Sequence, residues 1–483
     1  NVENSVLTAE VTSFNVNETY GFESEIVVDG TFTTDFNKAV SVIYTIDTSD
    51  DTVEVADGAF TINLGSDLLP GDHTIIIKSF ADEAGNTYIA GAEKTFNVLA
   101  PVKGSYSELA YLIKTADDVL DLPYDFAYNT SCDSKLIGGV LVSKDITING
   151  NGHTVSGENL AKIFDVWKAD VVITNITLAN GKSDDGGAIV VSNSITSLLL
   201  KDSVVKDSFS NQGGAIHVMS GKLTVENTTF TNNTAKCGGA IYHNTGSSTL
   251  TVKDSTFESN KATSTGTAGG AGAIHMNAGK LVVENTDFND NTAVSTGGAI
   301  NVVNFANAVT VTGSRFNRNS ASDGGAVHVK VTSCTLTVTD SNFTENSASG
   351  QGGAVYTQFT GVTTNIDNVI FAKNTARDGA ALVNKLGTSN IEKATFEDNT
   401  ATNQGGAIYA SGKVTVNESS FANNHATSDY NAYQIGENVI SIENTNITVP
   451  APDFNVKESY ENGENITVPG TFESGITNQQ VIL

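Results

Sequence analysis

The chain has 483 residues, of which 54 are acidic and 26 basic, so its formal net charge is −28 at pH 7. This excess of negative charge would repel a phosphate backbone, which excludes nucleic acid as a partner. Its three cysteines show no C-x-x-C spacing, which argues against a structural zinc site or a disulfide scaffold. No run of about 18 apolar residues is present, so we expect no membrane span.

Residues 1–100 contain alternating polar and apolar stretches, such as SEIVVDGTF and HTIIIKSF, separated by Gly/Asp turns. Period-two alternation is typical of half-buried strands, and the strand spacing predicts an immunoglobulin-like β-sandwich. The acidic segment 47–58 (DTSDDTVEVADG) is the one stretch we consider for Ca²⁺. Solvated surface charge is the alternative, because no EF-hand pattern is present. We assign no metal ligand and no other cofactor.

Residues 101–134 are predicted to form a helical cap. In SYSELAYLIKTADDVL, Ser105 and Glu108 have the spacing of a capping box, and Leu109, Leu112 and Ile113 share one helical face. A solenoid end exposes strand edges and an open core, so it needs a cap. We therefore expect this helix to plug the N-terminal end of the domain that follows.

A repeat of about 26 residues dominates residues 135–447. GGA[IVL] or a close variant begins at Gly186, Gly213, Gly238, Ala271, Gly297, Gly324, Gly352, Gly379 and Gly405. A Phe-x-x-Asn element follows it eight times, from Phe230, Phe257, Phe288, Phe316, Phe343, Phe371, Phe396 and Phe421. A fixed period of this size is typical of solenoids, and the stretches between the two elements, such as KLTVENTTF, alternate as strands do. The sequence predicts an all-β fold dominated by a right-handed parallel β-helix with about three short strands per coil.

Stacking gives each repeated residue type a physical role. Coils lie ~4.8 Å apart, so equivalent positions form columns whose members support one another. We expect the phenylalanines to stack inside and the asparagines to bond their equivalents at a turn. The first Gly should adopt a conformation closed to other residues, and the second should let neighbouring turns approach. These residues explain the fold and carry no activity.

Residues 448–483 repeat the beginning of the chain after a linker. FNVKESYENGENITVPGTF, from Phe454, aligns without a gap with FNVNETYGFESEIVVDGTF, from Phe14. We expect the first strands of a second immunoglobulin-like sandwich. Because half a sandwich cannot close its own core, the missing strands would come from a continuing chain or from another copy.

The GGA[IVL] and Phe-x-x-Asn repeats resemble those of the polymorphic outer-membrane proteins of chlamydiae. ITINGNGHTVSGENLAKIFDV and the following VVITNITLANG are still more similar to the adhesin-like β-helix proteins of methanogenic archaea. The resemblance covers about residues 105–448. It implies a surface-exposed, adhesive protein, and these families carry no catalytic motif to transfer.

Catalysis by a β-helix on acidic polysaccharides would need carboxylates a few ångströms apart. The column before the Gly pair reads Asp185, Gln212, Cys237, Gly270, Thr296, Asp323, Gln351, Asp378 and Gln404. Asp323 and Asp378 are two coils apart, with Gln351 between them. We therefore predict no enzyme and no catalytic residue; a polysaccharide lyase or hydrolase is an alternative.

Another column offers a candidate binding site. Two residues after each Gly-Gly-Ala alanine, the outward position should form an exposed stripe, in which the candidate ligand-binding residues are His217, Tyr242, His275, Asn301, His328, Tyr356 and Tyr409. Rings with polar edges could hold a linear glycan or a peptide. The competing interpretation is that rings simply stack well on parallel strands.

Nine Asn-x-Ser/Thr sequons fit an exported glycoprotein: Asn17, Asn129, Asn175, Asn227, Asn232, Asn342, Asn417, Asn446 and Asn465. Taken together, the sequence predicts an extracellular, cell-surface, adhesin-like rod. Its partners would be a cell-surface glycan or protein ligand and an adjacent immunoglobulin-like module of the same chain or another copy. A subunit of an extracellular filament joined through those modules is a second alternative.

Overall fold

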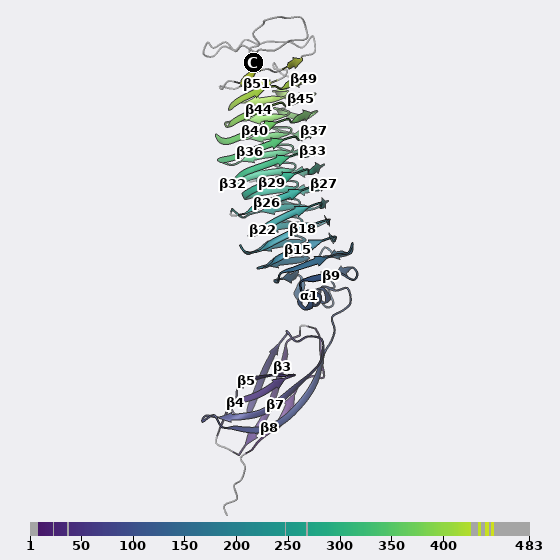
Figure 1. Ribbon diagram of the computed structural model, residues 1–483, viewed down its shortest axis with the longest axis vertical. Coiled ribbons are helices and arrows are strands. Elements are labelled where there is room, and N and C mark those ends of the chain that lie inside the picture. The colour runs from purple at the N-terminus through teal and green to yellow at the C-terminus, as the bar shows by residue number, and fades with distance from the viewer. Residues whose placement is uncertain are drawn as a thin grey trace, which may run out of the picture. The chain divides into compact units, whose positions relative to one another are not determined.

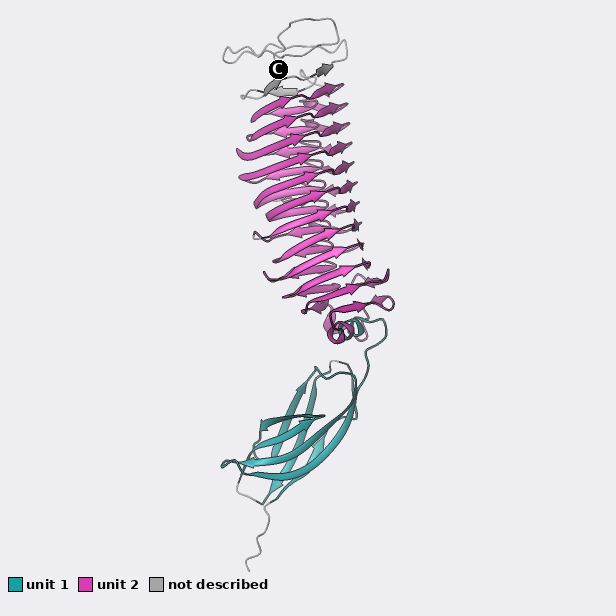
Figure 2. Ribbon diagram, in the orientation of Figure 1, with its two compact units in different colours: residues 1–111 teal, residues 112–483 magenta. Residues whose placement is uncertain are grey.

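The structure is a computed structural model that describes residues 8–426, except 23, 36–37, 247 and 267–268, together with three short strands beyond residue 432. Strands account for 57% of the chain and helix for 3%, which confirms the all-β prediction. Two compact units comprise residues 1–111 and 112–483 (Figures 1 and 2). The predicted second sandwich at residues 448–483 lies outside the described residues, apart from the end of the last strand.

The first unit is a β-sandwich of a three-stranded and a five-stranded sheet, in the described part of the chain. The smaller sheet has the order β1 (Ala9–Asn15), β3 (Ile26–Thr34), β6 (Ala59–Gly65). The larger has the order β2 (Thr19–Tyr20), β8 (Thr87–Val98), β7 (Gly71–Asp82), β4 (Ala39–Ile46), β5 (Ser49–Glu54). Inward-facing residues of both sheets form one core, in which the rings of Phe32 and Phe80 stack at 4.1 Å. The immunoglobulin-like assignment of this sandwich stays a prediction.

The predicted helix is present as α1 (Tyr106–Thr115). Its N-cap is Ser105, whose Oγ accepts a hydrogen bond from the backbone N–H of Glu108 at 3.2 Å. The Glu108 carboxylate accepts from the backbone N–H of Gly104 at 2.5 Å, so the reciprocal bond of the capping box is displaced by one residue. Beyond the helix, Lys144 Nζ donates to the carbonyl of Ala116, which ties the helix end to the solenoid.

The second unit is a parallel β-solenoid of about 11 turns. The parallel solenoid fold is confirmed, and its coils have about 27 residues, close to the predicted 26. Its described strands form three sheets. Most complete coils contribute four strands instead of three, because two of them lie in the largest sheet. Stacking begins at Val119, earlier than the predicted start at residue 135, because β9 and β10 already pair with the next coil.

The largest sheet contains two series of strands, which join because β29 and β32 run through both. The series after the Gly pair is β11 (Val140–Val142), β14 (Phe164–Trp167), β17 (Ile189–Ser192), β21 (Ile216–Val218), β25 (Ile241–His243), β29 (Ile274–Glu284), β32 (Ile300–Thr312), β35 (Val327–Lys330), β39 (Val355–Thr357), β43 (Leu382–Asn384), β47 (Ile408–Ala410), β51 (Tyr433–Ile435). The other is β9 (Val119–Asp121), β12 (Ile146–Asn149), β15 (Asp170–Thr174), β18 (Ser197–Lys201), β22 (Lys222–Glu226), β26 (Thr249–Lys253), β29, β32, β36 (Ser333–Thr339), β40 (Gly361–Asp367), β44 (Thr388–Glu392), β48 (Lys413–Asn417), β52 (Ile440–Glu443).

The second sheet carries the phenylalanines, and the third follows the Phe-x-x-Asn turn. The second comprises β10 (Phe126–Ala127), β13 (Thr154–Ser156), β16 (Thr177–Ala179), β19 (Val204–Lys206), β23 (Thr229–Thr231), β27 (Thr256–Glu258), β30 (Asp287–Asn289), β33 (Arg315–Asn317), β37 (Asn342–Thr344), β41 (Ile370–Ala372), β45 (Thr395–Glu397), β49 (Ser420–Ala422), β53 (Asn446–Thr448). The third comprises β20 (Phe209–Gln212), β24 (Thr234–Cys237), β28 (Lys261–Ala262), β31 (Thr292–Ala293), β34 (Ser320–Ala321), β38 (Ser347–Ala348), β42 (Thr375–Asp378), β46 (Thr400–Gln404), β50 (His425–Ala426). A short 3₁₀ helix, η1 (Ser134–Leu136), precedes β11.

The phenylalanines of the repeat form the predicted internal stack. Phe230 pairs in parallel register with Phe257, and the same pairing continues through every repeat to Phe421. Ring centroids lie 4.5 to 5.1 Å apart, and the ring planes are nearly parallel. All eight side chains are buried, so the prediction of a stacked aromatic core is confirmed.

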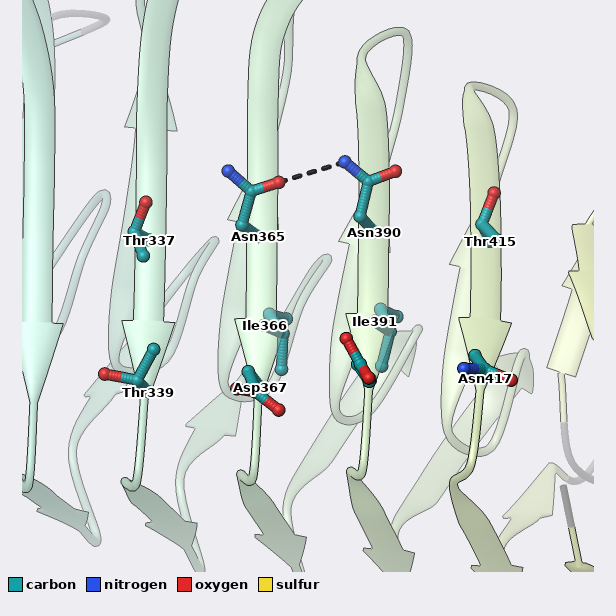
Figure 3. A pocket seen from close by; sticks show the side chains of 10 residues that line it. Thr337, Thr339, Asn365, Ile366, Asp367, Asn390, Ile391, Thr415 and Asn417 are labelled. Carbon is teal, nitrogen blue, oxygen red and sulfur yellow. Dashed lines mark hydrogen bonds between the residues drawn. The ribbon is translucent and has the colours of Figure 1, made fainter. Parts of the chain in front are cut away.

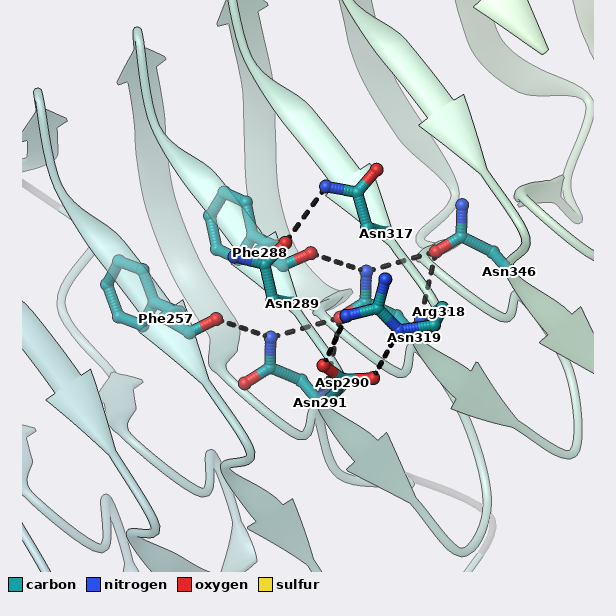
Figure 4. Close-up of polar contacts among 9 residues, drawn as sticks. All are labelled: Phe257, Phe288, Asn289, Asp290, Asn291, Asn317, Arg318, Asn319 and Asn346. Atoms are coloured by element: carbon teal, nitrogen blue, oxygen red, sulfur yellow. Dashed lines mark hydrogen bonds and ion pairs between the residues drawn. The ribbon is translucent and has the colours of Figure 1, made fainter. Parts of the chain in front are cut away.

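The asparagines three residues later form a buried ladder, the buried Asn ladder (Figure 4). It consists of Asn233, Asn260, Asn291, Asn319, Asn346, Asn374, Asn399 and Asn424. At Asn319, Nδ2 donates to the carbonyl of Phe288 and to Oδ1 of Asn346, at 2.9 and 3.0 Å. Its Oδ1 accepts from the backbone N–H and from Nδ2 of Asn291. Both donors and both acceptor positions of the amide are therefore used, which is what a fully buried amide requires.

The Gly pair behaves as predicted at Gly324 and Gly325. Gly324 has φ = 64°, in the left-handed region that favours glycine. A Cβ on Gly325 would lie 2.1 Å from the carbonyl oxygen of Gly353 in the next coil. The first Gly therefore makes the turn, and the second allows successive turns to stack in contact.

Candidate functional site

The predicted exposed stripe of rings is buried, so that prediction is wrong about exposure. His217, His275, Asn301, His328 and Tyr356 are each 3% exposed or less, Tyr242 is 8% exposed, and Tyr409 is half-buried. The turn that carries the Gly pair lies over the column: a Cβ on Gly324 would be 2.8 Å from Cβ of His328, and one on Gly352 would be 2.7 Å from Cβ of Tyr356. Strand alternation predicts an outward direction for these side chains but does not include this covering turn.

Within the column, successive side chains contact one another. The rings of Tyr242 and His275 stack at 4.9 Å. Asn301 then joins two histidines, because its Nδ2 lies 3.3 Å from Nδ1 of His275 and its Oδ1 lies 3.1 Å from Nδ1 of His328. The contacts agree with the stacking interpretation, and the buried column presents no continuous surface to a ligand.

Burial keeps four of the solenoid histidines neutral. It lowers the pKa of His217, His243 and His275 to about 4. It also lowers the pKa of His328 to about 3, with a smaller contribution from the charge of Lys330. Asp185 lies 3.3 Å from Nδ1 of His217 and opposes the effect of burial on the pKa there without overcoming it.

The acidic column before the Gly pair has the arrangement expected from the sequence. Gln351 lies between the two carboxylates: its backbone N–H donates to Asp323 at 2.9 Å, and its Nε2 lies 3.5 Å from Asp378 Oδ2. Asp378 also accepts from Arg377 and Asn403. Both carboxylates are therefore hydrogen-bonded to protein donors.

Carboxylates of the acidic segment in the sandwich also bind protein donors. Asp47 accepts hydrogen bonds from His73 and from the backbone N–H of Thr74, and both oxygens of Asp50 accept from Lys78 Nζ. Within the described residues, no group of three or more His, Cys, Asp or Glu side chains is placed to hold a metal ion. Calcium binding at segment 47–58 stays untested.

The sequons differ in exposure. Asn17, Asn175, Asn227 and Asn232 are exposed, whereas Asn129, Asn342 and Asn417 are half-buried. Asn446 and Asn465 lie where side chains are outside the described part of the structure. The first four are therefore accessible to glycosylation, which stays a prediction.

A groove of about 320 Å³ lies on the outer face of β36, β40, β44 and β48 (Figure 3). We call it the Thr/Asn groove. Parallel pairing brings outward side chains of four successive coils side by side. The lining side chains include Thr337, Thr339, Asn365, Asp367, Asn390, Glu392, Thr415 and Asn417. They supply hydroxyls, amides and carboxylates without an aromatic ring.

The centre of the groove is a pair of amides. Asn390 Nδ2 donates to Oδ1 of Asn365 at 2.9 Å. Figure 3 shows Nδ2 of Asn365 directed toward the strand of Thr337 and Oδ1 of Asn390 directed toward the strand of Thr415. Asn365 is half-buried and Asn390 is exposed, so these two ends of the pair face the groove.

One edge of the groove is acidic. Asp367 and Glu392 are register neighbours on β40 and β44, and both are exposed. Lys393 lies 3.3 Å from Glu392, and this bond, together with the charges of Glu392 and Asp367, raises the pKa of Lys393. These adjacent carboxylates lie outside the column before the Gly pair, so the prediction about catalysis missed them.

A weak signal for the groove is present in the sequence. At the central outward position, β15, β18 and β29 carry Val172, Leu199 and Val282, whereas β40 and β44 carry Asn365 and Asn390. Period-two alternation identifies these positions as outward. It does not predict that four such strands form a concave surface.

Among known families, the Chlamydia polymorphic membrane protein repeat matches residues 227–244, 340–358 and 393–411. The first match begins before β23 and ends after β25, so it contains Phe230, Asn233 and the Gly pair at Gly238. The matched unit is therefore the one that builds the Phe stack, the buried Asn ladder and the stacked turns. No curated protein and no solved structure matches the chain. In the described part of the chain, no helix is long and apolar enough to cross a membrane.

Proposed function

We propose that the chain is an extracellular, adhesin-like surface protein whose solenoid is a rigid support for binding surfaces. The observation that carries the proposal is the match to the Chlamydia polymorphic membrane protein repeat in three coils of a regular β-solenoid. Ladders run from coil to coil in such a solenoid, so it resists bending and holds its outer faces at fixed spacing. The exposed sequons and the net charge of −28 fit a solvated cell exterior.

The finer parts of the proposal rest on sequence alone. These parts are a relationship to the adhesin-like proteins of methanogenic archaea, glycosylation of the exposed sequons, and the joining of modules through immunoglobulin-like sandwiches. A filament built through those sandwiches is compatible with the same architecture. The adhesive role requires only that the solenoid faces reach the solvent.

The test is surface labelling. Antibodies raised against the full chain should label intact, unpermeabilised cells of the source organism, and proteases added outside should remove the signal. Labelling that requires cell lysis would overturn the proposal. This experiment does not depend on any particular ligand.

One specific observation favours the enzyme alternative, namely that Asp367 and Glu392 are neighbours on adjacent strands. Their strands are paired neighbours with a usual spacing of ~4.8 Å, which is close to the ~5–5.5 Å carboxylate separation of retaining glycoside hydrolases. A general acid of that type is held protonated by a protected environment, whereas both of these side chains are exposed and Glu392 pairs with Lys393. We therefore propose binding without cleavage.

A further inference from the structure

The amide pair in the Thr/Asn groove has unused hydrogen-bonding capacity. Among the described residues, Nδ2 of Asn365 and Oδ1 of Asn390 have no protein partner, whereas every position of the Asn319 amide in the buried Asn ladder is used. One end of the pair can donate and the other can accept, and Thr337 and Thr415 add a hydroxyl beyond each end. The row therefore offers alternating donors and acceptors across four coils.

The backbone around the groove is already occupied. The strands β36, β40, β44 and β48 pair in parallel with a neighbour on each side, so an added peptide could not extend the sheet there. The isoleucines of these strands, Ile366 and Ile391, are 2% exposed and point inward. The hydroxyl, amide and carboxylate groups of the other lining side chains are therefore the groups that can recognise a ligand by hydrogen bonds.

The negative charge of the groove edge distinguishes between neutral and anionic hydroxyl-rich ligands. Asp367 and Glu392 form the edge of the groove, and the whole chain is strongly acidic. Uronic-acid or sulfated polymers would bring like charges against these carboxylates. A neutral sugar avoids that repulsion, and its hydroxyls can donate to the carboxylates and both donate to and accept from the amides.

We propose that the Thr/Asn groove binds a neutral, linear glycan that runs along the solenoid axis across β36, β40, β44 and β48. Successive hydroxyl groups of the glycan contact Asn365 and Asn390, and the ~4.8 Å separation of coils sets the spacing of those contacts. The assignment rests on the proposed surface function and names the ligand class for one face of the solenoid. The groove contacts only a few sugar units, so strong attachment would come from many copies acting together.

The direct test is calorimetric titration of the full chain with neutral linear hexasaccharides, namely cellohexaose, chitohexaose and mannohexaose. We expect at least one to bind and the Asn365→Ala/Asn390→Ala variant to lose about tenfold or more in affinity. The matched control is Asn289→Ala/Asn317→Ala, because Asn317 donates to Asn289 at 2.9 Å across coils of another sheet. This control should bind like the original chain and should show that loss of an Asn–Asn bond alone does not cause the effect.

Charge reversal provides the second arm. Asp367→Lys/Glu392→Lys should gain affinity for oligogalacturonate, which the original chain should not bind. Failure of all three neutral sugars to bind at millimolar concentration would overturn the assignment, as would equal binding by the Asn365→Ala/Asn390→Ala variant. Binding of oligogalacturonate or of an extended peptide to the original groove, in preference to neutral sugars, would overturn it too. Surface labelling of intact cells could succeed in each of these cases, so failure of the ligand assignment is distinguishable from failure of the proposed function.

Discussion

The buried Asn ladder and the Asn pair of the Thr/Asn groove use the same side chain at the same coil spacing with opposite consequences. In the ladder, the Asn319 amide bonds the coil before it and the coil after it, and no position is left over. In the groove, Asn390 donates to Asn365 and the row of amides ends there. Nδ2 of Asn365 remains as a donor at one end, and Oδ1 of Asn390 remains as an acceptor at the other. A closed row stabilises the solenoid, whereas an open row on the surface can bind a ligand.

The substitution with the largest expected effect, Gly325→Ala, tests how closely successive coils must approach one another. Gly325→Ala would place a Cβ 2.1 Å from the backbone oxygen of Gly353, and no flexible side chain is available to move. We expect severe loss of folding, seen as aggregation or loss of the urea unfolding transition. Gly138→Ala is the control, because an added Cβ there meets nothing within 4 Å. Equal stability of the two variants would contradict the stacked-turn geometry.

The buried Asn ladder should be the next most sensitive feature. Asn319→Ala leaves several buried donors and acceptors unpaired in two coils, so it should lower the free energy of unfolding by about 3–6 kcal/mol. Asn317→Ala, two residues earlier, loses one half-buried bond to Asn289 and should cost less than about 1 kcal/mol. Urea titrations of both variants measure the difference. A small cost at Asn319 would mean that the ladder is not a main source of stability.

Acidification should separate the solenoid from the sandwich. In the solenoid, burial holds the pKa of His217, His243 and His275 at about 4 and that of His328 at about 3, so these groups stay neutral in the folded state. The unfolded chain binds more protons below its histidine pKa of about 6.5, so solenoid stability should fall as the pH falls from about 6.5 to 4. The cost should be on the order of 10 kcal/mol in total.

His73 in the sandwich should respond in the opposite direction. Burial lowers its pKa, but hydrogen bonds to Asp47 and to the carbonyl of Leu69 outweigh burial and raise the pKa overall. Its contribution to stability is complete below the unfolded pKa and is lost as the pH rises through the folded pKa. His275→Asn/His328→Asn should flatten the acid response of the solenoid, and His73→Gln should flatten the alkaline response of the sandwich. Unchanged pH profiles of thermal unfolding in both variants would contradict these assignments.

The smallest expected effect concerns catalysis. Neutral glycans and oligogalacturonate should show no new reducing or unsaturated ends after incubation with the chain. Asp367→Asn/Glu392→Gln and Asp323→Asn/Asp378→Asn should therefore behave like the original chain. A steady release of ends that either double variant abolishes would favour the enzyme alternative and would identify the responsible column.

Sequence reasoning predicted the parts of the solenoid in which a repeated residue has one physical solution. Phe230 and its equivalents must stack, Asn233 and its equivalents must bond along the column, and the Gly pair must turn and approach. It was wrong about the exposure of His275 and Tyr356, because a turn covers them and strand alternation alone does not describe that turn. It also missed the Thr/Asn groove, because concavity depends on the shape of four coils together. Repetition therefore predicts internal contacts better than surfaces.

Exchange of side-chain amide protons, measured by NMR on the full chain, tests the contrast between closed and open rows most directly. The NH₂ groups of Asn291, Asn319 and Asn346 should exchange slowly with or without ligand, because both of their protons are bonded inside the solenoid. The NH₂ group of Asn365 should exchange rapidly in the free protein and slow down, with a shifted resonance, when a neutral linear hexasaccharide is added. Rapid exchange in the buried Asn ladder, or an Asn365 resonance unaffected by every neutral sugar, would contradict the account.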